Sequence, residues 1–335
     1  MNFTLSDTQQ MVLDTARQLV DGEYSSSVIR AAWEEPSSAM PMWDRHLRGW
    51  TELAAGDMVD LGIFCHELGR GVVPGPFLST VMAALVLSAV DHPSAGDLVA
   101  GGSSATVAIS GADGIWVAND EHVRTHVTDA DLVDLVVVVG GTPAEPTVSV
   151  VARHDVECRE VDQYDRLRRQ YDVVVPSAHS STVAVPPDAL RDGLERCWVA
   201  VAAEAMGVAT WCLDTAIAYA KERVQFDRPI GSFQGLQWML VDAALAVQRS
   251  SAAVSYAAMC VDANDPDRHR AIHGAKAEAG RTARSVARTA VQVLGGIGYT
   301  WEHDLHFRLR RAYALDALGG PSTWHHDQLA GLLLD

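Results

Sequence analysis

The stretch Arg223-Val-Gln-Phe-Asp-Arg-Pro-Ile-Gly-Ser-Phe-Gln234 decides the fold of this chain of 335 residues. A long helical run ends just before it, and Pro229 and Gly231 predict a turn into a second helix. Arg223 and Gln225 then lie at the corner between two helices, where a guanidinium and an amide together form a set of hydrogen-bond donors. We interpret this corner as a site for an anionic ligand. Helix-end residues that only satisfy terminal carbonyls would give the same pattern.

A second pattern, Gln292-Val-Leu-Gly-Gly-Ile-Gly-Tyr299, follows another long helical run further along the chain. Its three glycines predict at least a helix C-cap and a turn. Glycine also lets backbone amides approach a ligand closely, as it does in cofactor sites. Taken alone, this pattern is compatible with either role.

The segments around these motifs predict an α+β fold that is mainly α and has three domains. Residues 1–103 have helical periodicity and begin with a capping box at Ser6–Gln9. Residues 104–186 change to a period of two, and their short runs favour a small β-barrel or sandwich. Residues 187–335 return to long helices that predict a four-helix bundle. The predicted strands are 105–109, 114–118, 123–127, 135–139, 147–151 and 173–175, and the predicted C-terminal helices are 189–222, 233–263, 267–294, 305–317 and 324–333.

Composition excludes several classes of partner. The net charge of -17 argues against nucleic acid or an anionic membrane, because both favour basic surfaces. We expect no membrane span, since no apolar run approaches the roughly 20 residues that a span requires. The N-terminus lacks the features of a signal peptide, which predicts a cytoplasmic protein. The five cysteines show no metal-ligand spacing and predict buried thiols, and the pair His325–His326 predicts surface residues rather than a metal site.

Together, the two motifs resemble the signatures of the acyl-CoA dehydrogenase family. The first matches Arg-x-Gln-Phe-x-x-Pro-Ile-Gly-x-Phe-Gln, and the second runs from Gln292 to His303 and is followed by Leu309-Arg-Arg-Ala312. The order of helical domain, β domain and helical bundle is also the order of that family. The resemblance covers residues 186–315 most strongly. It implies an enzyme that desaturates acyl-CoA thioesters, in which a carboxylate takes the α-proton and hydride leaves the β-carbon for FAD. It also implies an electron-transfer flavoprotein or a similar acceptor.

The resemblance also implies which residues of this chain contact an FAD molecule that a neighbouring subunit holds. Arg223 and Gln225 would lie on the pyrophosphate side, and Phe226 and Phe233 near the adenine end. The second motif would contact the dinucleotide through side-chain and backbone groups. The full set of implied contacts is Arg223, Gln225, Phe226, Phe233, Gln234, Gln292, Gly295 and Gly296.

The carboxylate that the resemblance requires is missing from both places where the family keeps it. The first place falls on Gly319, which has no side chain to take a proton. The second lies ten residues before the glycine that matches Gly207, and it falls on Cys197, a thiol with no evident activating neighbour in the sequence. Glu195 is two residues earlier, a rotation of about 200° on a helix, and we expect it on the solvated surface. Glu204 is no better placed.

Two other stretches depart from the family pattern. Ile109–Ile115 does not match the stretch in which hydroxyls and amides meet the flavin ring. Ala54–Asp57 stands where a loop containing Gly-Gly is expected. These departures predict that the chain does not build a whole active site by itself.

Three hypotheses follow. In the first, the chain resembles the short subunit, lacking the Glu, of α2β2 actinobacterial acyl-CoA dehydrogenases of the sterol side-chain type, as its ending Leu318–Ser322 also suggests. It would then lend FAD contacts to a catalytic homologue. In the second, it is a self-sufficient homo-oligomeric dehydrogenase whose base is Glu195 or Glu204. In the third, it is a scaffold that binds no flavin.

Overall fold

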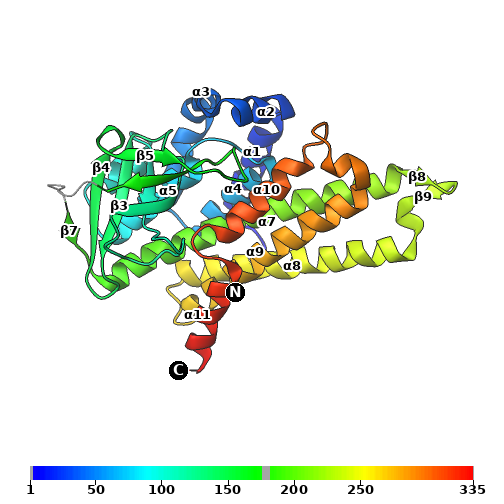
Figure 1. Ribbon diagram of the computed structural model, residues 1–335. Helices are drawn as coiled ribbons and strands as arrows, with labels where there is room; N and C mark the ends of the chain where they lie inside the picture. Colours follow the sequence, from blue (N-terminus) through cyan, green and yellow to red (C-terminus); the bar gives the residue numbers. More distant parts are fainter. Residues whose placement is uncertain (1–2, 176–181, 335) are drawn as a thin grey trace. The chain divides into compact units, whose positions relative to one another are not determined.

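The computed structural model describes residues 3–175 and 182–334 (Figure 1). The fold is mainly helical α+β, as predicted, with N-terminal helices, middle β-sheets and C-terminal helices. The chain forms two compact units that alternate along the sequence. The first comprises Met1–Asp21, Gly62–Val73 and Val201–Asp335, and the second comprises Gly22–Leu61 and Pro74–Ala200. The division into three domains at 103/104 and 186/187 stays a prediction.

The first helix, α1 (Asp7–Glu23), begins at the capping box that the sequence predicts. The Gln9 amide donates to Ser6 Oγ at 3.2 Å, and the Ser6 amide donates to Gln9 Oε1 at 3.0 Å. This reciprocal pair satisfies two backbone donors that the helix start leaves without partners. The other helices before the sheets are α2 (Ser26–Glu34), η1 (Pro36–Ala39), α3 (Met40–Met42), η2 (Trp43–Leu47), η3 (Arg48–Ala55), α4 (Met58–Gly71), α5 (Phe77–Ala89) and α6 (Ala95–Val99).

The middle of the chain forms two small sheets within the second unit. One has the strand order β1-β3-β4-β7, in which β1 and β3 are parallel and the other pairs antiparallel, and the other is antiparallel with the order β2-β6-β5. Buried residues of both sheets, among them Val127, Val136 and Val173, form one hydrophobic core. The strands are β1 (Ala105–Ala108), β2 (Val123–Thr128), β3 (Leu135–Gly141), β4 (Pro146–Ala152), β5 (Glu157–Glu160), β6 (Gln170–Val174) and β7 (Val183–Ala184), with η4 (Arg153–Asp155) after β4.

The predicted strand at 114–118 is wrong. The backbone there bonds locally, because the Val117 amide donates to the Ile115 carbonyl at 3.0 Å. The Asn119 side-chain amide donates to the carbonyls of Val117 and Ile109 at 3.0 and 2.8 Å. A side chain that takes backbone carbonyls in this way competes with sheet pairing. Trp116 is nevertheless buried, which explains the apolar pattern that suggested a strand.

The C-terminal helices follow the predicted boundaries within two residues. Helices α8 and α9 are joined by a short turn and pack against each other, so they run antiparallel (Figure 1). Helix α9 also packs against α10 and α11. The elements are α7 (Pro187–Glu222), β8 (Val224–Gln225), β9 (Arg228–Pro229), η5 (Ile230–Ser232), α8 (Gln234–Asp262), α9 (Arg268–Leu294), η6 (Gly295–Tyr299), α10 (Leu305–Ala317) and α11 (Ser322–Leu334).

Helix α7 corrects the expectation that no segment is long and apolar enough to cross a membrane. By length and composition α7 passes that test, with a mean hydropathy of 1.2 over its most apolar window. However, 83% of that window is buried inside the protein, which identifies α7 as a core helix. A helix that is apolar on all sides is expected at the centre of a fold.

Candidate functional site

The first motif forms a small hairpin between α7 and α8. Strands β8 and β9 pair through Val224 with Pro229 and Gln225 with Arg228. The two turn residues, Phe226 and Asp227, have φ of 53° and 61°, the backbone of a type I′ turn. The sequence predicts a turn here but no hairpin, because Phe-Asp lacks the asparagine or glycine that marks such turns. Residues 221–229 are all exposed, including Arg223 and Gln225.

Aromatic contacts hold the hairpin against the start of α8. The ring of Phe226 meets the edge of Phe233 with centroids 6.1 Å apart. The Arg228 guanidinium lies 4.0 Å from the centroid of Phe233, a cation–π contact that the sequence did not reveal. Phe233 precedes α8 as its N-cap residue, and Gln234 is exposed in the first turn. Phe226 remains 87% exposed, so the hairpin presents an uncovered aromatic ring.

The second motif ends α9, and the groups that the resemblance implies for FAD contact are accessible there. Gln292 is exposed in the last turn, and Gly295 caps the helix with φ of 63°. That backbone angle favours glycine. A Cβ added to Gly295 or Gly296 would meet no heavy atom within 4 Å. Gly295 is therefore required for its backbone conformation, and the space beside both glycines stays open to a ligand.

Both motifs lie at the same end of the bundle. The first connects the C-terminal end of α7 to the N-terminal end of α8, and the second follows the C-terminal end of α9. Because α8 and α9 are antiparallel neighbours, the start of α8 and the end of α9 share one end (Figure 1). The structure thus brings Arg223, Gln225, Gln292 and the glycines to one accessible region.

This set of donors suits the diphosphate of FAD. Arg223 supplies a guanidinium, which binds phosphate oxygens through a planar fork of N–H groups. Gln225 and Gln292 supply amides, and the open backbone at Gly295–Gly296 allows close approach. Gln225 Nε2 currently donates to the carbonyl of Val224 at 2.6 Å, so it would turn to reach a ligand. An aromatic ring as exposed as Phe226 can pack against an adenine.

Gly319, the first position implied for the base, lies in the connection between α10 and α11. It has φ of 77°, and the following Gly320 has φ of 106°. The Lys276 ammonium donates to the carbonyls of Asp316 and Gly320 at 3.1 Å each. His325 Nε2 donates to the Gly319 carbonyl at 3.3 Å. A buried lysine and a buried histidine thus bind the connection at this glycine, and the buried Asp316 carboxylate at its start accepts a hydrogen bond from Ser322 Oγ at 2.8 Å.

The prediction that His325–His326 lies on the surface is wrong for His325, which is fully buried, while His326 is exposed. His325 Nδ1 lies 2.9 Å from His273 Nδ1. Because His325 Nε2 carries the proton that it donates to a carbonyl, its Nδ1 is unprotonated and accepts a hydrogen bond from His273 Nδ1–H. Burial lowers the pKa of His273 to about 4, and burial together with the Lys276 charge lowers the pKa of His325 to about 2.

We expect this histidine pair to make the protein less stable in mild acid. The unfolded histidines have a pKa near 6.5 and take up protons first as the pH falls, so folding free energy is lost from pH 6.5 downward. Each of the two histidines removes about 1.4 kcal/mol of the unfolding free energy for every pH unit between its unfolded and its folded pKa. Urea unfolding at pH 7.5 and 5.5 measures the loss. His325→Gln should reduce the pH dependence, whereas His326→Gln should retain it; equal slopes for both variants would contradict the assignment.

Cys197, the second position implied for the base, is a buried structural thiol. Its Sγ donates to the Met82 carbonyl at 3.4 Å, and burial raises the pKa of the thiol well above its ordinary value. A thiol with a raised pKa is a poor base at neutral pH. The prediction that Glu195 lies on the solvated surface is wrong, since it is 1% exposed. Helix α7 is buried on several sides around it, so the face opposite Cys197 is not solvent.

Glu204 is also buried, and it is paired. Its Oε1 lies 2.7 Å from Nη1 of Arg311, and the two side chains are 3% and 0% exposed. Helix α4 approaches α7 closely at this level, since a Cβ on Gly69 would lie 2.0 Å from the Glu204 carbonyl oxygen. Likewise a Cβ on Gly207 would lie 1.8 Å from the His66 carbonyl oxygen. Glu204 therefore neutralises a buried arginine inside a tightly packed pair of helices.

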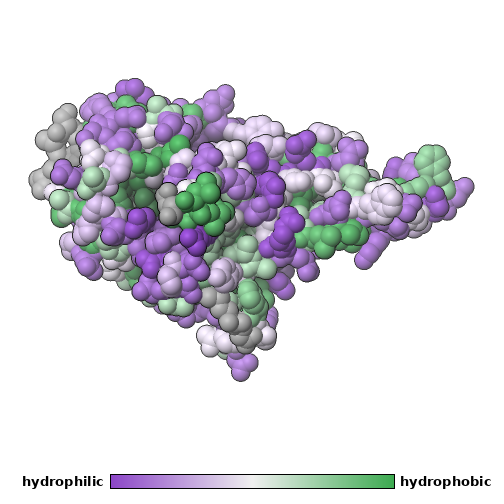
Figure 2. Space-filling model, turned by 90° about the horizontal axis from the view of Figure 1, so that it is seen from below, coloured by the Kyte–Doolittle hydropathy of each residue, from purple (hydrophilic) through white to green (hydrophobic). Residues whose placement is uncertain are grey.

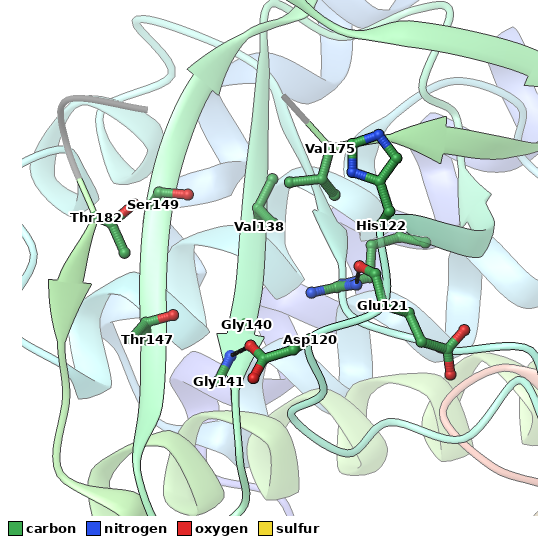
Figure 3. A pocket seen from close by; sticks show the side chains of 11 residues that line it. Asp120, Glu121, His122, Val138, Gly140, Gly141, Thr147, Ser149, Val175 and Thr182 are labelled. Carbon is green, nitrogen blue, oxygen red and sulfur yellow. Dashed lines mark hydrogen bonds between the residues drawn. The ribbon is translucent and has the colours of Figure 1, made fainter. Parts of the chain in front are cut away.

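A cavity of about 240 Å³ lies in the β-sheet unit, away from both motifs in the sequence (Figure 3). Its arginine, Arg124, is already occupied by backbone carbonyls, with Nε bonded to Val139 at 3.1 Å and Nη2 to Asn119 at 2.7 Å. Asp120 Oδ1 accepts from the Gly141 amide at 2.7 Å. Arg124 and Asp120 are therefore engaged in holding the strand ends together, while Glu121 and His122 also line the cavity.

Comparison with known proteins connects this geometry to one family. Residues 190–334 match the family model described as acyl-CoA dehydrogenase, C-terminal domain. The chain is 30% identical over 326 residues to acyl-CoA dehydrogenase IpdE2 of Mycobacterium tuberculosis, covering 93% of this chain and 92% of that protein. It is 36% identical over 281 residues to acyl-CoA dehydrogenase FadE34 of the same species, covering 81% of this chain but only 38% of FadE34.

Two solved structures share the fold. The ChsE4–ChsE5 complex from Mycobacterium tuberculosis contains a chain with a TM-score of 0.87 and 23% identity, covering 100% of this chain and 99% of that chain. A variant of the Tcur3481–Tcur3483 steroid ACAD gives a TM-score of 0.86 and 22% identity, with 99% of each chain covered. At these identities the likeness shows the fold.

Proposed function

Because this chain belongs to the acyl-CoA dehydrogenase family, we propose that it is a subunit of a FAD-dependent acyl-CoA dehydrogenase that completes the cofactor site of a catalytic partner. The partner is a homologous subunit that carries the Glu base, in an α2β2 assembly. The complex removes two hydrogens from the α and β carbons of an acyl-CoA thioester. An electron-transfer flavoprotein or a similar acceptor reoxidises the flavin.

One contrast carries this proposal: the cofactor-binding groups are present and accessible, while the expected base positions hold no base. Arg223 and Gln292 are exposed, and the backbone at Gly295 is open. Gly319 has no side chain, and the Cys197 thiol is buried with a raised pKa. A chain with this combination would contact FAD without a base at either position that the family uses, so in this proposal the α-proton goes to a carboxylate on another chain.

In this proposal the residues of this chain bind and orient, and FAD, when bound, accepts the hydride. Arg223 neutralises diphosphate charge that the acidic chain would otherwise repel. Gln292 and the backbone at Gly295–Gly296 fix the position of the dinucleotide, and Phe226 and Phe233 cover its adenine. Each contact acts in trans, on a cofactor that the partner subunit also holds.

The test compares the chain alone with the chain co-expressed with a homologue that retains the Glu. We expect the chain alone to purify without stoichiometric flavin and to desaturate no acyl-CoA, including steroid side-chain thioesters. The complex should be yellow and active with an artificial electron acceptor. A chain that alone binds stoichiometric FAD and desaturates a thioester would overturn the heteromeric proposal. A colourless, inactive complex would favour a flavin-free scaffold.

A second candidate is a self-sufficient homo-oligomeric dehydrogenase with Glu195 as its base. The observation that favours it is the burial of Glu195, which is 1% exposed, because a general base acts in a site from which bulk water is excluded. If Glu195 is the base, Glu195→Gln should lower the rate by several orders of magnitude, since an essential base has no substitute. An unchanged rate per folded enzyme would remove this candidate.

A further inference from the structure

The cavity in the β-sheet unit lies where the core between the two sheets changes from apolar to polar (Figure 3). Alternate residues of a strand point to the same face, so every second residue of β3 and β4 faces this core. The facing pairs along the two strands are Val136 with Val151, Val138 with Ser149, and Gly140 with Thr147. Toward the Gly140 end the paired side chains thus become polar and lose volume. The cavity of about 240 Å³ occupies the space that larger side chains would fill.

Two hydroxyl groups of β4 face the cavity, and neither forms a hydrogen bond with a residue of the described chain. Ser149 is 2% exposed, and Thr147 lies two residues earlier on the same face of the strand. Figure 3 shows both hydroxyl oxygens pointing from β4 toward β3. A buried polar group without a hydrogen bond costs free energy, so these hydroxyls indicate that a polar ligand or water occupies the cavity.

Arg124 brings a positive charge to the same cavity, and it is 2% exposed. Three of its five N–H groups donate to backbone carbonyls, those of Glu121, Asn119 and Val139. No salt bridge joins it to a carboxylate within residues 3–175 and 182–334. Burial lowers the pKa of the guanidinium, although the nearby charges of Glu121 and Asp120 raise it. Two N–H groups and much of the charge therefore stay available to a ligand.

Gly140 leaves open the space between Arg124 and Thr147. A Cβ built on this glycine would lie 3.1 Å from Thr147 Oγ1 and 3.6 Å from Arg124 Nη2. An atom at that place is at or near hydrogen-bond distance from both groups. A residue with a side chain would occupy this point, so the glycine keeps it free for an acceptor atom of a ligand.

The charges at the cavity favour a ligand with a single negative charge. The guanidinium and the two hydroxyls can all donate hydrogen bonds, a set that suits the oxygens of an oxyanion. The carboxylates of Asp120 and Glu121 also line the cavity, and they accept bonds from the amides of Gly141 and Ala112 at 2.7 and 3.1 Å. They repel a doubly charged phosphate more strongly than a monocarboxylate.

The size and the walls of the cavity favour a short carbon chain on this carboxylate. A volume of about 240 Å³ corresponds to roughly eight water molecules at about 30 Å³ each, which is room for a carboxylate and a few carbon atoms. Val138 and Val175 supply apolar surface for the carbons. The β-sheet unit, on the left of Figure 2, presents mainly hydrophilic residues to this view with smaller apolar areas between them, so a water-soluble ligand fits it better than a lipid.

We propose that this cavity binds the carboxylate of a short aliphatic acid. The carboxylate oxygens accept hydrogen bonds from Arg124, Thr147 and Ser149, and the carbon chain lies against Val138. The ligand thereby supplies a negative charge and acceptors for these donors. Because Arg124 belongs to β2 and the two hydroxyls to β4, the bound acid links the two sheets at this end and stabilises the unit. None of these residues is assigned to FAD, so the inference is separate from the proposed function.

The first test is calorimetric titration of the purified full chain with sodium butyrate, against sodium chloride and inorganic phosphate at equal ionic strength. We expect butyrate to bind once per chain, with a Kd on the order of 1 mM or below, and to raise Tm. Chloride should do neither. The absence of a saturable heat with butyrate would overturn the inference, because the cavity would then hold only water. Tighter binding of phosphate than of butyrate would contradict the choice of a carboxylate.

Two variants locate the bound acid while keeping Arg124, whose carbonyl contacts also hold the strands. Gly140→Ala should abolish butyrate binding, since its methyl group occupies the place of a carboxylate oxygen. Ser149→Ala should weaken it about tenfold by removing one hydrogen bond to a charged group. Gly96→Ala is the matched control in the same unit and should bind butyrate as the parent does, because its added Cβ would meet no heavy atom within 4 Å. Unchanged affinity in both cavity variants, with circular dichroism showing a folded chain, would place the acid elsewhere and overturn the inference.

The flavin content of the complex separates this site from the proposed function. We expect Gly140→Ala to lose butyrate binding and to keep the flavin of the parent complex. Loss of both would contradict a separate acid site. A colourless parent complex whose butyrate binding responds to Gly140→Ala would support the acid site and count against the proposed function alone.

Discussion

Arg223→Ala is expected to remove most of the FAD from the purified complex. The guanidinium is exposed at the end of the bundle and, in our proposal, donates charge-assisted hydrogen bonds to the diphosphate. Each such bond contributes about 1.5–3 kcal/mol, so its loss should weaken FAD binding about 10- to 100-fold. Flavin absorbance per protein after gel filtration and titration of the apo complex with FAD measure this change.

Lys221→Ala provides the matched control for this effect. Lys221 is an exposed cation at the end of the same helix, two residues before Arg223, and its removal changes the net charge equally. If FAD affinity depended only on overall charge, both variants would weaken it alike. Equal flavin content in Arg223→Ala and the parent complex would remove Arg223 from the cofactor site. If both complexes were colourless, the hypothesis of a flavin-free scaffold would be favoured instead.

Glu204→Gln is expected to destabilise the fold strongly without changing the chemistry. It leaves the Arg311 guanidinium, which is 0% exposed, without its carboxylate at 2.7 Å. Breaking a buried ion pair by removing one partner costs about 3–5 kcal/mol, because an uncompensated charge stays buried. Urea unfolding of the purified chain should show this loss as a lower midpoint. Asp214→Asn, an exposed carboxylate on the same helix, should stay within about 0.5 kcal/mol of the parent.

The same variant separates a structural role for Glu204 from a catalytic one. Turnover per folded complex should be unchanged, since in the proposed assembly the base belongs to the partner. A loss of turnover by orders of magnitude in folded Glu204→Gln would instead identify Glu204 as the base. Replacing both partners, as in Glu204→Leu combined with Arg311→Met, should recover part of the lost stability, because neither charge of this pair then stays buried without its partner.

Most of the helices could be predicted from the sequence because their signals are local. The capping box at Ser6–Gln9 forms as its hydroxyl and amide predict, and the helix predicted at 305–317 has these same bounds in the structure. Strand β5 was missed because Glu157–Glu160 pairs with only one neighbour and carries mostly exposed charged side chains, so it lacks an apolar alternation. Local patterns identify elements, but not sheet edges.

The candidate site was less predictable because burial depends on tertiary packing. Glu195 was expected on the surface from its rotation relative to Cys197, but both residues are buried, and the partly exposed positions of α7 at that level are Asp192 and Arg196. The pairing of Glu204 with Arg311 joins residues far apart in the sequence and leaves no local signal. Glycines gave more information, since the open space beside Gly295 and Gly296 agrees with a ligand-facing role. Their contact with FAD stays a prediction.

The connection around Gly319 also bears on how readily evolution could reverse the loss of the base. A glutamate at Gly319 would need a φ of 77°, which side-chain-bearing residues rarely adopt, and the carbonyls beside it are bound by Lys276 and His325. Burial lowers the pKa of Lys276 to about 8, so this lysine is still mostly protonated at neutral pH. A base at Gly319 would therefore have to be accommodated together with changes in the groups that bind this connection. In the proposed heteromeric assembly, this connection favours keeping the base on the partner subunit.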